Sequence, residues 1–338
     1  MKCFYLKPKS PFHLQAGSLD HESVDEFPRS DTLSSALTSL WFREYGEVPG
    51  FPDQMPFQVS STFPVLELNG EMKPFYPKPI GIAIKPDDVE HKLVKKVRYF
   101  DQPLFSRWAN GDWKDAYWPV NSDDPRLDGS KTLLAAEPVS DSMWDKPLLK
   151  KHVYTRVVLD RVTSASTPFH FVSVRYNAHV RLGILADIDP VHEASFTAML
   201  RLLGDEGIGA DRTVGMGQFE LEGVEEAEPP VSNPGSGCWY NMGVFNPADD
   251  TADTGISWEE SAYGLQNRYG WVSGTSLRRR PLAVVTEASV LQSETRPAGS
   301  VRVVLDPESD PIPEDQQGVI NHKIYRDARG FLLPVAAQ

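Results

Sequence analysis

Cysteine and long apolar segments are the features that this sequence of 338 residues has least of. Only Cys3 and Cys238 are present, too few for a disulfide framework or a cysteine-based metal site. No apolar run approaches the ~20 residues that a membrane-spanning helix needs. No secretory leader pattern precedes Cys3 either. We therefore expect a cytoplasmic protein with no membrane association.

Basic residues are outnumbered, with 34 Lys and Arg against 47 Asp and Glu and a net charge of −13. This balance argues against a wholly basic nucleic-acid-binding protein, because that binding is driven by neutralisation of phosphates. Many carboxylates nevertheless fall in loop-like tracts such as 222–228 and 308–314, while Lys and Arg cluster elsewhere. A local basic surface on an acidic protein is compatible with this composition.

Familiar catalytic motifs are also missing. None of the eight histidines pairs at the spacing of metal ligands on a helix, and no Gly-x-Ser-x-Gly or His-Glu-x-x-His occurs. His13 could act as a general base in RNA cleavage, but a lone histidine in a strand is more often a packed structural residue. The sequence therefore indicates no enzyme, no cofactor and no metal site.

Glycine, by contrast, is concentrated in one stretch, with five glycines between residues 204 and 217. The stretch joins a predicted helix, 191–203, to a predicted strand that begins at Phe219. Glycine loses the most backbone entropy on folding, so a ligand or a close backbone contact should offset that cost. Successive N–H groups in such turns form anion-binding nests. With Arg212 in the middle of the loop, phosphate is the expected ligand.

The common phosphate-binding motifs do not match this loop. A Walker loop needs Lys followed by Ser or Thr after its last glycine, and neither follows Gly217. Arg212 stands where a dinucleotide fingerprint has its third glycine, and that fingerprint follows a strand and opens a helix, which is the reverse order. The alternative interpretation is a flexible surface loop without a ligand.

The hydrophobic pattern predicts an α+β fold. Strands are expected at 1–6, 55–68, 153–158, 169–174 and 180–188, with a helix at 32–44. Strand–helix–strand order thus occurs once in each half of the chain. Residues 92–138 combine lysines with many aromatic side chains, a mixture that suits single-stranded nucleic acid; we favour the alternative, a small core or a protein interface. Arg278–Arg280 is the densest basic run and is expected to be a solvated turn.

Several stretches together resemble the RAMP superfamily. The segments 12–14 and 30–37 resemble its opening motif, 154–163 resembles its arginine-containing strand, and 204–217 resembles its glycine loop. The run Gly270-Trp271-Val272, followed by 278–280 and 287–290, is similar to one group, as is 322–326 near the C-terminus. That group forms the fourth subunit of the type III-A CRISPR (Csm) effector complex. The resemblance covers nearly the whole chain in the correct order.

The resemblance implies two ferredoxin-like (RRM-like) halves with an inserted β-hairpin thumb. The N-terminal half would span residues 1–150, with the thumb at about 92–140. The C-terminal half would span residues 151–338 and contain the glycine-rich loop 204–217.

The resemblance also implies a non-catalytic structural subunit. Such a subunit caps the complex by binding the 5′ repeat-derived tag of the CRISPR RNA (crRNA). Its protein partners would be the large polymerase-type subunit and the backbone RAMP subunit, which it bridges. Two alternatives stay open: a RAMP endoribonuclease that processes repeat RNA with His13 as its base, and the equivalent capping subunit of a type III-B (Cmr) complex.

For RNA binding, the resemblance implies a cleft with the glycine loop as its phosphate cradle. The tag is single-stranded RNA, which proteins hold with backbone N–H groups, cations and stacking aromatic rings. The residues expected to line this cleft are Arg212, Thr213, Gly207, Gly209, Gly215, Gly217, His13, Ser30, Arg156 and Arg161.

Overall fold

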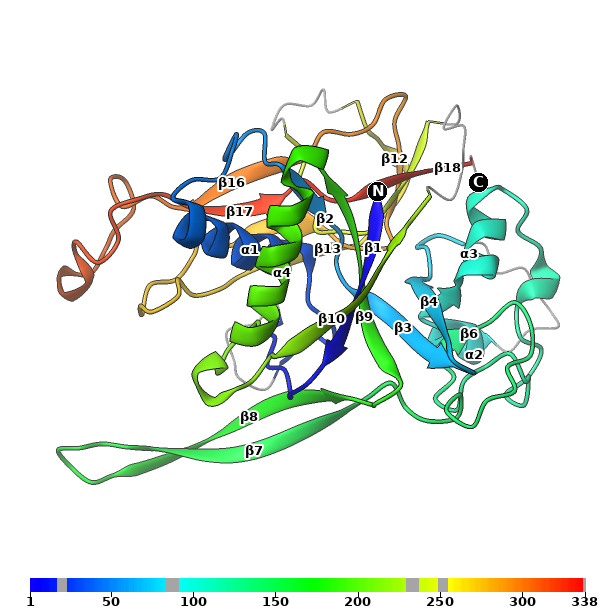
Figure 1. Cartoon of the computed structure of the whole chain (residues 1–338), viewed down its shortest axis with the longest axis horizontal. Coiled ribbons are helices and arrows are strands. Elements are labelled where there is room, and N and C mark those ends of the chain that lie inside the picture. The colour runs from blue at the N-terminus through cyan, green and yellow to red at the C-terminus, as the bar shows by residue number, and fades with distance from the viewer. Residues whose placement is uncertain (17–22, 83–90, 229–236, 249–254, 337–338) are drawn as a thin grey trace.

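The computed structural model describes residues 1–16, 23–82, 91–228, 237–248 and 255–336 (Figure 1). Its largest sheet has eight strands, in the order β10-β1-β9-β3-β4-β5-β6, with β2 also pairing with β9. Neighbouring strands are antiparallel except β5 and β6. The strands are β1 (Lys2–Pro8), β2 (Phe57–Val59), β3 (Phe63–Leu68), β4 (Glu71–Pro77), β5 (Tyr99–Asp101), β6 (Leu133–Leu134), β9 (Val180–Ile188) and β10 (Phe219–Glu226).

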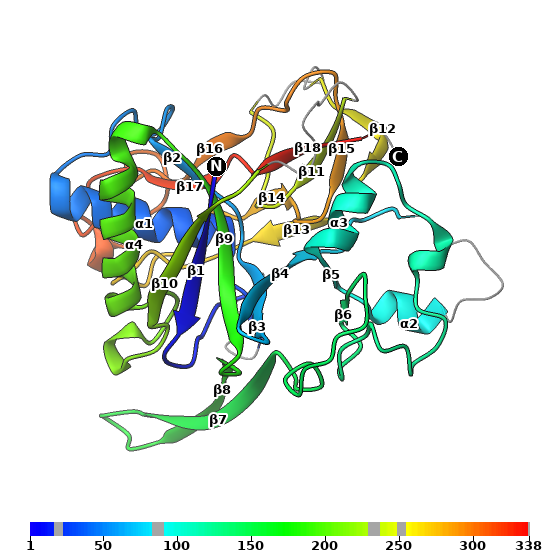
Figure 2. The ribbon, with the colours of Figure 1, turned by 45° about the vertical axis from the view of Figure 1, so that its right-hand side comes forward.

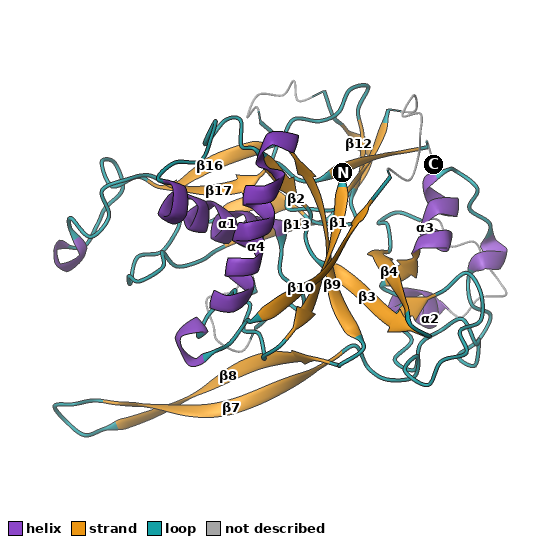
Figure 3. Ribbon diagram, in the orientation of Figure 1, coloured by secondary structure: helices purple, strands orange, loops and turns teal. Residues whose placement is uncertain are grey.

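Four of these strands and two helices have the chain order β1-α1-β3-β9-α4-β10. This is the βαββαβ pattern of a ferredoxin-like unit, interrupted by an insertion between β3 and β9. The helices α1 (Ser30–Tyr45) and α4 (Glu193–Glu206) pack side by side against the sheet (Figure 3). The prediction of an α+β fold is confirmed.

Strand β1 is buried on both faces of the sheet. Phe4 and Leu6 belong to the hydrophobic cluster formed with α1 and α4, whereas Cys3 and Tyr5 belong to the cluster formed with the second sheet. Successive side chains of a strand point to opposite faces, so both sets of neighbours must be apolar. This explains why the first strand is an unbroken run of apolar residues from Cys3 to Leu6.

The second sheet has the order β12-β15-β11-β18. Read from the β18 edge, the order is the fourth, first, third and second strand of this sheet in the sequence. The strands β10, β1, β9 and β3 of the first sheet follow the same 4-1-3-2 order. No α-helix connects them within residues 237–248 and 255–336. The strands of this region are β11 (Cys238–Asn241), β12 (Ser257–Ala262), β13 (Leu265–Arg268), β14 (Leu282–Val285), β15 (Val290–Gln292), β16 (Ser300–Leu305), β17 (Ile324–Ala328) and β18 (Leu332–Val335).

The predicted boundary between residues 150 and 151 is wrong. Strand β1 pairs with β9 on one edge and with β10 on the other, so the first unit continues to the end of β10 at Glu226. The second sheet begins with β11 at Cys238. Alternation of apolar residues predicts strands but not their partners, and here the partners lie about 180 residues or more apart in sequence.

The predicted position of the hairpin, about 92–140, is also wrong. That stretch contains β5 and β6, which extend the largest sheet, and α2 (His91–Lys96) and α3 (Gln102–Ala109), which lie near that end of the sheet in Figure 2. Its aromatic side chains form a core: Phe100, Phe105, Trp108 and Trp118 are at most 2% exposed. The long hairpin is instead β7 (Leu149–Leu159) with β8 (Ser166–Tyr176), which extends from the body in Figure 1.

A buried carboxylate joins α1 to the C-terminal region. Asp31 lies in the first turn of α1, where its Oδ2 and Oδ1 accept hydrogen bonds from Nε and Nη2 of Arg268 at 3.0 and 3.1 Å. Nη1 of Arg326 also donates to Asp31. Burial alone would raise the pKa of Asp31, but the two guanidinium groups hold that pKa below its usual range.

Replacement of Asp31 tests this junction. Asp31→Asn leaves the buried guanidinium of Arg326 without a carboxylate and Arg268 with Asp25 alone. We therefore expect the free energy of unfolding to fall by about 3–5 kcal/mol, measured by urea denaturation. The exposed Asp53 is the matched control, and Asp53→Asn should change stability by less than about 0.5 kcal/mol.

The same variant should show a characteristic pH dependence. Because the folded-state pKa of Asp31 lies below the unfolded value of about 3.9, its stabilisation is fully present above that pH and is lost as the pH falls further. The stability difference between wild type and Asp31→Asn should therefore narrow below about pH 4. A difference that is independent of pH would contradict an ionised Asp31.

Candidate nucleic-acid interface

The pairing of β10 with β1 fixes the place of the glycine loop. The register joins Pro8 to Phe219, so the loop that precedes β10 lies beside the segment that follows β1. The N–H of Ala210 donates to the carbonyl of His13 at 2.9 Å, and the N–H of Gly217 donates to the carbonyl of Pro11 at 2.8 Å. The loop is thus hydrogen-bonded to the N-terminal segment.

Close backbone contacts exclude a side chain at four of the five loop glycines, all except Gly215. Gly209 has φ +96°, and a Cβ atom there would overlap the carbonyl oxygen of His13. Gly217 has φ +79°, and its Cβ would overlap the carbonyl oxygen of Ile208. Gly207 and Gly215 also have positive φ angles. Glycine is the residue that adopts this conformation at no steric cost.

A stack of three side chains lies next to the loop. The guanidinium of Arg156 on β7 lies 4.0 Å from the centroid of the Phe171 ring on β8. Phe171 in turn stacks on His13, with ring centroids 4.2 Å apart and an interplanar angle of 18°. His13 is 2% exposed, and its Nδ1 lies 2.6 Å from the carbonyl oxygen of Val172. The stack therefore holds the middle of the hairpin against the N-terminal segment.

Asp211 connects the loop to the same stack. Its Oδ2 forms an ion pair with Nη1 of Arg156 at 2.5 Å, with side chains 26% and 38% exposed. Asp211 adopts the left-handed backbone conformation, with φ 59°, directly before a 3₁₀ turn at Arg212–Val214. Three segments far apart in sequence, at residues 13, 156–171 and 209–211, thus meet at one place.

Arg212 and Thr213 follow on the exposed side of the loop. Within the part of the chain that the structure describes, neither side chain forms a hydrogen bond, and the guanidinium of Arg212 forms no ion pair. Arg156, by contrast, is already engaged by Asp211 and Phe171. An unpaired guanidinium on a backbone that is fixed from two sides can accept an anion without breaking an existing ion pair.

Ser30 was expected in the same cleft, and the structure places it elsewhere. It begins α1 and is 5% exposed. Its hydroxyl accepts a hydrogen bond from the N–H of Val244 at 2.8 Å, and its own N–H donates to the hydroxyl of Ser61 at 2.9 Å. Ser30 therefore joins α1 to the C-terminal region. Its place in the opening motif reflects this structural contact and not the loop.

Arg161 also lies away from the loop, in the exposed turn that joins β7 to β8. In Figure 1 this turn is at the far end of the hairpin. His13, Arg156 and the glycine loop therefore lie together, whereas Arg161 lies at the tip of the hairpin.

Phe171 and Asp211 were not predicted as site residues. Phe171 lies within a predicted strand, and its pairing opposite Tyr154 became evident only from the hairpin register. Asp211 stands in the loop directly before Arg212. A carboxylate in a loop expected to bind phosphate is a signal for a neighbouring cation that needs a partner, and here that cation is Arg156.

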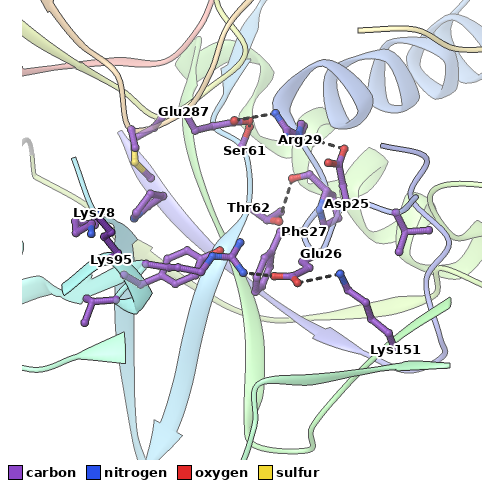
Figure 4. Close-up of a pocket in the computed structure, with 18 residues that line it drawn as sticks. Asp25, Glu26, Phe27, Arg29, Ser61, Thr62, Lys78, Lys95, Lys151 and Glu287 are labelled. Carbon is purple, nitrogen blue, oxygen red and sulfur yellow. Dashed lines mark hydrogen bonds and ion pairs between the residues drawn. The ribbon is translucent and has the colours of Figure 1, made fainter. Parts of the chain in front are cut away.

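A second concave region lies between the base of the hairpin and the second sheet (Figure 4). This cavity of about 560 Å³ contains both charge signs. Arg98 Nη1 and Lys151 Nζ lie 2.5 and 3.1 Å from Glu26, and burial alone would raise the pKa of Glu26, but these two cations lower it. Arg29 Nη1 lies 3.1 Å from Glu287. Most cations here are already neutralised, so the cavity is a poorer phosphate site than the loop.

Metal-binding and membrane-spanning features were also sought within the described ranges. No group of three or more His, Cys, Asp or Glu side chains there could hold a metal ion. Among the same residues, no helix is both long and apolar enough to cross a lipid bilayer.

Comparison with known proteins gives two curated relatives, although no family model matches the sequence. One, from Methanocaldococcus jannaschii, is named CRISPR system Cms protein Csm4 and is 22% identical over 376 aligned residues, covering 99% of this chain and 97% of the relative. The other, from Thermococcus onnurineus, has the same name. It is 31% identical over 306 aligned residues and covers 89% of each chain.

Solved structures share the fold. A chain of a Csm3-Csm4 subcomplex from the type III-A CRISPR-Cas interference complex has a TM-score of 0.66 and 18% identity, with 100% of both chains covered. A chain of a Csm1-Csm4 cassette in complex with pppApA has a TM-score of 0.54 and 16% identity, covering 100% of this chain and 99% of the other. A chain of a type III-B Cmr-beta complex bound to cognate target RNA and AMPPnP has a TM-score of 0.50 and 11% identity, with 86% of each chain covered.

The packing of the loop against His13 can be tested with one glycine. Gly209→Ala should lower the free energy of unfolding by more than Gly46→Ala, by at least about 1 kcal/mol. Both positions have positive φ, but a Cβ at Gly46 would have no neighbour within 4 Å. The difference between the variants, measured by urea denaturation, thus isolates the contact with His13. Equal losses would contradict the close approach.

Proposed function

The chain belongs to the Csm4 family, and from this premise we propose that it is a structural subunit of a type III-A CRISPR RNA-guided interference complex. Chains of the same fold occur in Csm3-Csm4 and Csm1-Csm4 subcomplexes. This chain would therefore bridge the corresponding two partners, the backbone RAMP subunit and the large polymerase-type subunit. The family and the shared fold support this role.

We propose further that the glycine loop binds the 5′ tag of the crRNA. The observation that carries this proposal is the unpaired, exposed Arg212 on a loop held by His13 on one side and by Arg156 on the other. The loop is already folded, so little ordering entropy opposes RNA binding there. Thr213 would add a hydroxyl donor beside the guanidinium. The cleft of Arg156, Phe171 and the loop then holds the phosphates in one position.

The β7–β8 hairpin corresponds to the thumb in this proposal. It has 11 residues in each strand and carries exposed apolar side chains toward its end, among them Val157, Leu159 and Val162 at 53%, 67% and 93% exposure. Exposed apolar side chains that gather in one region are typical of an interaction surface. The thumb would contact a neighbouring component of the complex, with Arg161 at its tip.

The proposed role is non-catalytic. A repeat-cleaving RAMP nuclease would need His13 as an accessible base, but this imidazole is 2% exposed and stacked on Phe171. A general base must come within hydrogen-bonding reach of the proton that it removes. The type III-B alternative has weaker support, since both curated relatives are named Csm4 and the Cmr-beta chain is 11% identical.

Replacement of Arg212 tests tag binding. With the chain purified together with its partner subunits, Arg212→Ala should weaken binding of a synthetic RNA carrying the repeat-derived tag by roughly tenfold, about 1.4 kcal/mol. The slope of log affinity against log salt should become shallower by about 1, since one phosphate contact is lost. Thermal unfolding should change little, because Arg212 forms no hydrogen bond or ion pair among the described residues.

The matched control is Arg201→Ala, which removes an exposed arginine from α4 outside the loop. It should leave tag affinity and salt dependence unchanged. If Arg212→Ala behaves like this control, the loop does not bind the tag phosphates.

A cleavage assay tests the non-catalytic role. The purified chain, incubated with CRISPR repeat RNA in EDTA, should leave the RNA intact, as judged by denaturing gel electrophoresis. Metal-independent cutting that is abolished by His13→Gln would show instead that the buried imidazole becomes exposed and acts as a base.

A further inference from the structure

A cavity of about 760 Å³ lies on another part of the molecule, between α1, the loop at 270–279 and the β16–β17 hairpin. Apolar side chains dominate its walls. They include Phe42, Phe51, Met55, Val272, Ile320 and Ile324. A cavity of this size accommodates a few side chains of another molecule.

One partly exposed guanidinium in the wall of this cavity forms no hydrogen bond or ion pair with the residues that the structure describes. The Nε of Arg279 is buried without a hydrogen-bond acceptor, and its side chain forms no ion pair with any residue that the structure describes. Its neighbours in sequence differ: Arg278 is exposed and lies 4.7 Å from the Trp271 ring centroid, whereas Arg280 pairs with Asp310 at 3.3 Å. The expectation of a solvated basic turn thus fits Arg278 and Arg280, which are exposed, and fits Arg279 only in part.

Carboxylates near Arg279 are already used. Asp327 also lines the cavity, but Arg329 lies 2.7 Å from its Oδ2, and Ser34 donates to the same oxygen at 2.7 Å. Asp31 is shared by Arg268 and Arg326. Burial, and then repulsion from Arg326, lowers the pKa of Arg279 to about 10, so the guanidinium is still charged at neutral pH.

The remaining polar groups of the wall do not supply an anion. Lys323 pairs with Asp306 at 3.2 Å, and His322 Nδ1 lies 3.3 Å from the side-chain oxygen of Asn321. The Arg279 guanidinium is partly buried and has no directly paired carboxylate, so its lost hydration is poorly compensated. An apolar cavity that carries one such cation is complementary to a ligand with one carboxylate and an apolar body.

We propose that this cavity receives a segment of a partner subunit that places an Asp or Glu carboxylate against Arg279 and a large aliphatic or aromatic side chain against the apolar wall. RNA is a poorer match, because phosphate backbones are held by several cations and bases by exposed stacking rings. Among the described lining residues, Arg279 is the unpaired arginine or lysine. The inference rests on the proposed function in that the partner is one of its two neighbouring subunits.

Replacement of Arg279 should lower the affinity for a partner subunit without lowering the thermal stability of the chain. In binding assays between the purified chain and each of its own partner subunits, Arg279→Met should weaken binding to one of them by at least tenfold. The thermal midpoint of the isolated chain should be unchanged or higher, since a partly buried cation without a direct ion pair is removed. A lower midpoint with undiminished binding would make Arg279 a structural residue and overturn the proposal.

Arg278→Met is the matched control, because it removes the adjacent exposed arginine and leaves the cavity intact. It should change affinity less than threefold. An equal loss for Arg278→Met and Arg279→Met would mean that general surface charge, and not the cavity, governs binding.

The occupant can be identified by photo-crosslinking in the assembled complex. Benzoylphenylalanine at Ser39, which lies on the α1 side of the cavity, should crosslink to a partner segment that contains Asp or Glu within two residues of Leu, Ile, Met or Phe. A crosslink to RNA, or none to either partner subunit, would overturn the proposal.

Binding of the wild-type chain separates a failure of the proposed function from a failure of the cavity proposal. If the wild-type chain binds neither subunit, the proposed function itself is wrong. If the wild type binds both subunits and Arg279→Met binds them equally well, only the inference about the cavity is wrong.

Discussion

The antiparallel pairing of β10 with β1 is the constraint on which the candidate site depends. Because Pro8 lies opposite Phe219, the chain that leaves α4 must pass beside residues 11–13 before it can enter β10. That passage requires backbone contacts that only glycine allows, as at Gly209 and Gly217. The close backbone contacts are therefore sufficient to explain the glycines without a ligand. The proposal of RNA binding rests on Arg212 and Thr213, which lie between Gly209 and Gly215. The Arg212 side chain is exposed to solvent, on a loop whose backbone is hydrogen-bonded to Pro11 and His13.

Ion pairs between arginines and carboxylates join segments that lie far apart in the sequence. The chain carries an excess of acidic residues, yet most cations in its interior and clefts have a carboxylate partner, as Arg268 has Asp31 and Arg156 has Asp211. Arg212 and Arg279 differ from these cations, since neither forms a hydrogen bond or an ion pair among the described residues. Arg212 is exposed on a folded loop and suits a phosphate. Arg279 lies partly exposed in the wall of an apolar cavity and suits a carboxylate.

Local features were predicted well from the sequence, and long-range ones were not. The helix expected at 32–44 is Ser30–Tyr45, and the strand expected at 180–188 is Val180–Ile188. The unit boundary was wrong because apolar alternation does not reveal that β1 pairs with β9 and β10. The hairpin was misplaced because rings such as Trp108 look the same in sequence whether they pack in a core or face a ligand. His13, Arg156 and the loop were correctly placed together, whereas Ser30 and the stacking of Phe171 became clear only from tertiary contacts.

The central claim is that Arg212 and its loop hold a phosphate of the crRNA tag. The most direct measurement is a cryo-EM structure of the complex assembled from this chain, its partner subunits and crRNA. We expect a tag phosphate oxygen within about 2.7–2.9 Å of the Arg212 guanidinium, with the loop still hydrogen-bonded to His13. A tag that passes elsewhere while Arg212 stays in solvent or pairs with a protein carboxylate would contradict it.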